Sequence, residues 1–104
     1  MYTLKLSEPF IDDVDSSVKY IEQTLQAPVA ARRLKDEVRK AYKKIKEAPF
    51  TYPVVPDKYL ASIGYRFKMV NNYMLFFIVD DNVIEIDRFL YGRRDWMNIL
   101  RKNN

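Results

Sequence analysis

The feature that most constrains the fold is the run Tyr73–Val79, in which every residue is apolar. Turn-forming residues border it, Asn71-Asn72 before and Asp80-Asp81-Asn82 after, so its length favours a strand. Side chains of a strand alternate between the two faces of a sheet, and a strand that is apolar throughout must be covered on both faces. We therefore expect a sheet that lies between two layers of other structure.

Two further strands are expected beside this one, at residues 65–70 and 83–90, after the chain-breaking Gly64. The short turns at 71–72 and 80–82 would join all three into an antiparallel meander. Residues 2–6 alternate apolar and polar side chains, which predicts a short first strand.

Two amphipathic helices are expected between the first strand and the meander. The first runs from Ser7, a preferred N-cap residue, to about Leu25, and Gln26-Ala27-Pro28 ends it. The second runs from Pro28 to about Glu47. The expected inward residues are Ile11, Val14, Val18, Ile21 and Leu25 in the first helix, and Ala30, Leu34, Val38, Ala41 and Ile45 in the second.

The segment 48–63 contains three prolines, and we expect an extended loop that packs its aromatic side chains. Residues 93–101 predict a terminal helix with Trp96, Ile99 and Leu100 on one side. The two long helices can cover one face of the strand 73–79. Its other face is covered either by the terminal helix or by a second chain, and the sequence leaves both open.

Composition limits the kinds of site that the chain can hold. A length of 104 residues predicts one domain, spanning 1–104, with a single core. Cysteine and histidine are both absent, which removes disulfides, thiol chemistry, the usual transition-metal ligands and the commonest general base. No secretion signal or membrane span is visible, so we expect a cytoplasmic protein without a metal or other cofactor and without a membrane partner.

Charge is unevenly distributed although the net charge is only +4. Residues 8–22 carry five Asp or Glu against one lysine, whereas residues 28–47 carry eight Lys or Arg against three Asp or Glu. A basic helix of this kind is either a solvated surface or a contact for phosphates or an acidic protein.

Four charged residues fall within the expected meander: Arg66, Lys68, Glu85 and Asp87. Counting outward from a two-residue turn at 71–72 and a three-residue turn at 80–82 places all four on one face of the sheet. A slip of one residue would change that face. The cationic side chains then either neutralise phosphate charge during a reaction or form ordinary surface ion pairs. The carboxylates alone are a poor metal or glycosidase site.

The order of these elements, together with several local motifs, resembles the RelE/ParE superfamily of bacterial toxins. The motifs are the connection with Pro49 and Tyr52-Pro53, the strand Gly64-Tyr65-Arg66-Phe67-Lys68, the segment Asn72–Phe77, and the closing Asp87-Arg88-Phe89-Leu90-Tyr91-Gly92-Arg93-Arg94-Asp95-Trp96. The resemblance covers nearly the whole chain. It implies an α+β, microbial-ribonuclease-like fold in the order β-α-α-β-β-β(-α), with the antiparallel meander packed on two helices.

The resemblance also implies a toxin of a type II toxin–antitoxin (plasmid stabilization) module, neutralised by a cognate antitoxin protein. RelE-like members bind the ribosome and cleave messenger RNA as metal-independent mRNA interferases; ParE-like members inhibit DNA gyrase and are not nucleases. We expect RelE-like cleavage first and gyrase inhibition as the alternative. The catalytic candidates for cleavage are Arg66, Lys68, Arg88, Arg94 and Tyr91, and Tyr91 either acts as a general acid or base or packs against Trp96.

Two positions depart from the RelE-like pattern. An arginine is usual where this chain has Met74, and a tyrosine is usual near Leu100. Neither replacement can stabilise the charge of a phosphorane. Whether the chain is an enzyme, a gyrase inhibitor or a degenerate member that only binds its partner therefore stays open at this stage.

Overall fold

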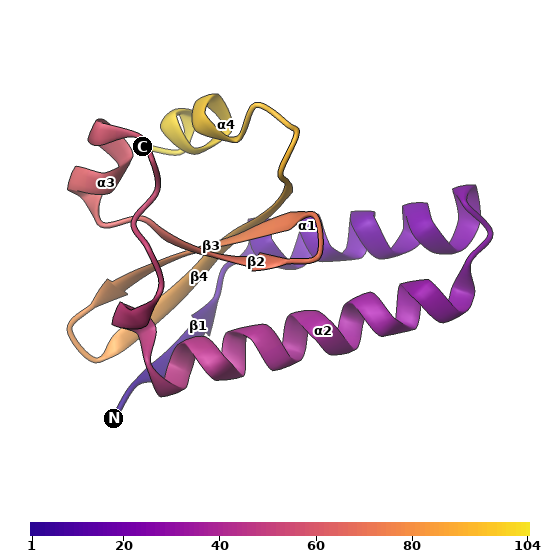
Figure 1. Ribbon diagram of the computed structural model, residues 1–104, viewed down its shortest axis with the longest axis horizontal. Coiled ribbons are helices and arrows are strands. Elements are labelled where there is room, and N and C mark those ends of the chain that lie inside the picture. The colour runs from indigo at the N-terminus through magenta and orange to yellow at the C-terminus, as the bar shows by residue number, and fades with distance from the viewer.

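The computed structural model describes residues 1–104, and its centre is a four-stranded sheet in the order β1-β4-β3-β2 (Figure 1). The strands are β1 (Thr3–Leu6), β2 (Arg66–Val70), β3 (Tyr73–Asp80) and β4 (Val83–Tyr91). β2, β3 and β4 form the expected antiparallel meander, and β1 adds to β4 in parallel. The apolar strand β3 therefore lies inside the sheet. The α+β class and the element order are confirmed.

Two long helices lie between β1 and the meander, as predicted. α1 (Glu8–Lys19) begins after Ser7, whose side chain accepts a hydrogen bond from the backbone N–H of Phe10, and it continues as a π-helical turn, η1 (Tyr20–Thr24). α2 runs over Pro28–Glu47, as the sequence predicted. None of the helices is both long and apolar enough to span a bilayer.

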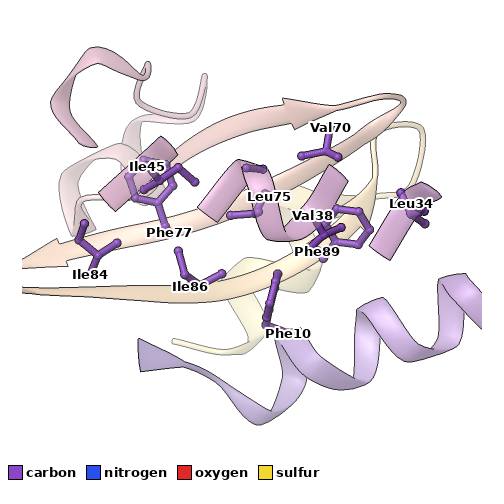
Figure 2. Close-up of a cluster of buried hydrophobic side chains, with 11 residues drawn as sticks. Phe10, Leu34, Val38, Ile45, Val70, Leu75, Phe77, Ile84, Ile86 and Phe89 are labelled. Carbon is purple, nitrogen blue, oxygen red and sulfur yellow. The ribbon is translucent and has the colours of Figure 1, made fainter. Parts of the chain in front are cut away.

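The core between these helices and the sheet contains eleven buried side chains (Figure 2). They are Phe10, Leu34, Val38, Ala41, Ile45, Val70, Leu75, Phe77, Ile84, Ile86 and Phe89. Two details of the predicted stripes were wrong. α1 is anchored by Phe10, while Ile11 and Leu25 are 44% and 55% exposed, and α2 buries Ala31 where Ala30 was expected.

The opposite face of the sheet is covered by two short helices of the same chain. α3 (Lys58–Ile63) and α4 (Trp96–Lys102) lie there, and their buried residues Leu60, Trp96 and Leu100 pack with Met74 and Phe76 of β3. Figure 1 shows α3 and α4 on the side of the strands opposite to α2. The sequence left open whether this face is covered by the terminal helix or by a second chain. In the structure, helices of the same chain cover it.

The segment 48–63 is not wholly extended, contrary to expectation. A 3₁₀ turn, η2 (Pro49–Thr51), comes first, and α3 begins after Asp57, whose carboxylate accepts from the N–H of Leu60. The prolines precede α3 and so do not disrupt it. Gly64 ends the helix at φ 109°, a conformation that favours glycine. The terminal helix also starts later than expected, at Trp96 instead of Arg93.

The register of the meander places the charged residues on two faces. Val70 pairs with Tyr73, as predicted, so Arg66 and Lys68 lie opposite Phe77 and Leu75 on the α2 side. The second turn, however, has two residues instead of three. Glu85 consequently pairs with Ile78, whose side chain packs toward α3 and α4. The prediction that all four charges share a face was wrong, because one residue of register reverses every side chain of a strand.

Candidate functional site

A cleft of about 780 Å³ opens between the end of the α1–η1 helix and the adjoining ends of β3 and β4. Its volume is typical of a ligand or side-chain binding site. Two of the five predicted catalytic residues, Tyr91 and Arg94, line this cleft. The lining residues are Asp13, Ser16, Ser17, Tyr20, Ile21, Leu25, Asn71, Asn72, Tyr73, Phe89, Tyr91 and Arg94.

Aromatic side chains build one wall of this cleft. Tyr73 stacks on Phe89 with 4.7 Å between the ring centroids and an interplanar angle of 11°. Tyr91 meets Tyr73 edge to face at 5.6 Å. Tyr91 therefore packs against Tyr73 rather than against Trp96, whose indole contacts Phe76 instead. Arg94 is exposed beside this wall.

Arg88 lies next to the cleft but its charge is compensated. Its Nε and Nη2 donate to the two carboxylate oxygens of Asp13 at 2.7 and 2.9 Å, and the backbone N–H of Phe89 donates to the same carboxylate at 3.0 Å. The hydrogen bonding that Arg88 donates to the Asp13 carboxylate raises the pKa of Arg88. This bidentate pair fastens α1 to β4, so Arg88 has a structural partner that sequence reasoning did not provide.

Arg66 and Lys68 lie apart from the cleft, on the edge strand β2. Arg66 donates from Nη1 to the carbonyl oxygen of Tyr52 at 2.6 Å, and its guanidinium lies 5.0 Å from the centroid of the Phe50 ring. The Lys68 ammonium lies 5.1 Å from the Tyr52 ring centroid. Both cations thus contact the proline-rich segment after α2.

The two positions that depart from the RelE-like pattern belong to the core. Met74 is 7% exposed and Leu100 is fully buried, and both pack in the cluster under α3 and α4. The side chains at these positions fill space between the sheet and α4. Neither position therefore carries a charged or hydroxyl group.

Sequence reasoning missed a second polar cluster, on the α3 and α4 side. The Tyr65 hydroxyl donates to Asp87 at 2.7 Å and accepts from the side-chain amide of Asn104 at 3.2 Å. Burial is the main reason why the pKa values of Tyr65 and Glu85 are raised. Contact with Asp87 raises both pKa values further. The spacing of Glu85 and Asp87 indicated that they are neighbours, but no local pattern predicted Tyr65 or Asn104.

Comparisons with known proteins agree with this architecture. The family described as "ParE toxin of type II toxin-antitoxin system, parDE" matches residues 4–96. The chain belongs to this family. It is therefore a toxin of a type II toxin–antitoxin system within the RelE/ParE superfamily, as the sequence motifs indicated.

Two solved structures show how widely this ParE-family fold is shared. A chain of the chromosomal ParDE toxin–antitoxin system from P. aeruginosa superposes with a TM-score of 0.73 at 18% identity, covering 88% of this chain and 96% of that one. YafQ from E. coli strain BL21(DE3) superposes with a TM-score of 0.55 at 14% identity, and the match covers 88% of this chain and 93% of YafQ. At these identities the likeness concerns the fold alone. Among curated proteins, no sequence matches.

Proposed function

We propose that this ParE-family toxin arrests growth by binding DNA gyrase and that it does not cleave messenger RNA. The family match supports this, since it names ParE and covers most of the chain. Inhibition by binding requires a complementary surface, whereas cleavage requires charged groups gathered around one phosphate.

The placement of the predicted catalytic residues carries the proposal. Tyr91 and Arg94 line the cleft, Arg88 is held by Asp13, and Arg66 and Lys68 contact the segment after α2. The five residues therefore do not surround one point, because Arg66 and Lys68 lie on β2 outside the cleft and the charge of Arg88 is compensated by Asp13. Stabilising a phosphorane needs donors preorganised around its equatorial oxygens, and the loss of one such donor typically costs about a hundredfold or more in rate.

The core positions of Met74 and Leu100 strengthen the argument. Restoring an arginine or a tyrosine there would place a polar group among the buried side chains of the cluster under α4. RelE-like cleavage, our first expectation from the sequence, is thus less well supported than the gyrase alternative.

We further propose a cognate antitoxin as the partner of this chain. The fold is similar to that of a chain from the chromosomal ParDE toxin–antitoxin system of P. aeruginosa, in which a toxin is paired with an antitoxin. Expression of the toxin alone should then stop growth, and co-expression of the adjacent antitoxin gene should restore it. Unimpaired growth with folded toxin accumulating would identify a degenerate member and would overturn the proposal.

Two assays with purified protein distinguish the targets. The toxin should inhibit supercoiling of relaxed plasmid by gyrase in proportion to its concentration, and heat-denatured toxin is the control. Messenger RNA on translating ribosomes should stay intact at the same toxin concentrations. Unaffected supercoiling, or codon-dependent cuts in the messenger RNA, would refute gyrase inhibition.

A further inference from the structure

The outward surface of α2 carries a concentration of positive charge that neither the cleft nor the proposed target uses. Eight of the chain's 18 Lys and Arg residues lie on this helix, with three carboxylates. All of these charged residues are exposed. Figure 1 shows α2 along one side of the molecule, with the sheet and α1 on its inner side and no other element on its outer side.

Five of these cations form a row along one flank of the helix, which we call the α2 row. Steps of three or four residues keep side chains on one face of a helix. With a rise of 1.5 Å per residue, the row is about 21 Å long. Its members are Arg32, Lys35, Arg39, Lys43 and Lys46.

The α2 row has almost no charge partners within the chain. The one ion pair on α2 joins Arg39 to Asp36 at 3.9 Å, and both side chains are at least 60% exposed. A pair that is so exposed and so long contributes little. Lys35 and Arg39 also line a groove between α1 and α2 that contains Asp15, but every cation of the row is exposed and can meet an external anion.

We propose that the α2 row binds the phosphate backbone of duplex DNA. Duplex DNA carries about one negative charge per 1.7 Å of its axis when both strands are counted, so a row of five cations about 21 Å long lies opposite a high density of phosphates. An acidic protein partner is less well matched, because protein interfaces have an apolar centre. No large apolar side chain is exposed on α2 beyond Val29. The inference does not depend on gyrase as the target, although DNA binding would bring the toxin to where gyrase works.

Salt dependence of DNA binding provides the test. We would measure the fluorescence anisotropy of a labelled 20-base-pair duplex with purified toxin between 50 and 200 mM salt. Five phosphate contacts predict a slope of about −4.5 in log K against log salt, or a roughly 500-fold loss over this range. The triple variant Arg39→Gln, Lys43→Gln, Lys46→Gln keeps two contacts, so its slope should fall to about −1.8.

A matched control variant distinguishes the effect of losing the α2 row from the effect of lowering the net charge. The control Lys19→Gln, Lys58→Gln, Lys102→Gln removes the same charge from exposed positions outside α2 and should keep the wild-type slope. Both variants should fold, because glutamine is a good helix former. Circular dichroism would confirm this. Absence of binding at 50 mM salt, an unchanged slope in the α2 variant, or an equal change in the control would each overturn the proposal.

Discussion

Replacing Asp13 with alanine should destabilise the protein substantially. The change removes the acceptor of three hydrogen bonds, two from Arg88 and one from the backbone N–H of Phe89. The side chains of Arg88 and Asp13 are only 16% and 12% exposed. Leaving one partner of a buried ion pair uncompensated typically costs 3–5 kcal/mol, and the residual exposure lowers our expectation to about 2–3 kcal/mol.

Urea unfolding followed by circular dichroism measures this loss. Asp12→Ala is the matched control, because Asp12 is the exposed neighbour on the same helix and should change the free energy of unfolding by less than about 0.5 kcal/mol. The double variant Asp13→Ala, Arg88→Leu removes both charges and should be more stable than Asp13→Ala alone. A loss below about 0.5 kcal/mol for Asp13→Ala, or costs that simply add in the double variant, would refute a structural role for the pair.

Three further substitutions test the packing and electrostatics of the fold. Leu100→Ala should lower the free energy of unfolding by about 2–4 kcal/mol because Leu100 is fully buried, and Ile99→Ala, at a half-buried position, should cost less in the same urea titration. Gly64→Ala should cost about 1 kcal/mol through its φ of 109°, and an unchanged midpoint would contradict this. Burial and Asp87 raise the pKa of Glu85 above 4.5, so the folded state binds this proton more tightly than the unfolded chain. Glu85→Gln should therefore raise the melting temperature at pH 7, and its advantage should shrink as the pH falls toward 4.5; a lower melting temperature at pH 7 would disprove it.

Most of the fold could be predicted because its signals are local. The observed bounds of α2 follow from Pro28 at its start and from the helical spacing of its buried residues, Leu34, Val38, Ala41 and Ile45. The unbroken apolar run of β3 predicted a strand covered on both sides, and the structure confirms it. These features follow from periodicity, which a single sequence records directly.

What sequence reasoning missed depends on register and on distant partners. A turn of two residues and one of three both suit Asp80-Asp81-Asn82, yet the choice decides which face Glu85 occupies. Asp13 meets Arg88 across 75 residues of sequence, and nothing near either residue indicates that contact. The resemblance named the catalytic candidates but not their positions, and the structure places Tyr91 and Arg94 at the cleft and Arg66 and Lys68 on β2.

The pairing of β1 with β4 delays completion of the sheet during synthesis of the chain. Ser7, just after β1, bonds to the backbone of Asp87, 80 residues later in the chain. Translation at about 5–20 residues per second takes about 4–16 s to cover that distance. Until β4 leaves the ribosome, the amino-terminal strand has no neighbour and the sheet cannot close. The four-stranded sheet is therefore complete only after β4 has emerged, so any surface that needs the whole sheet forms late in synthesis.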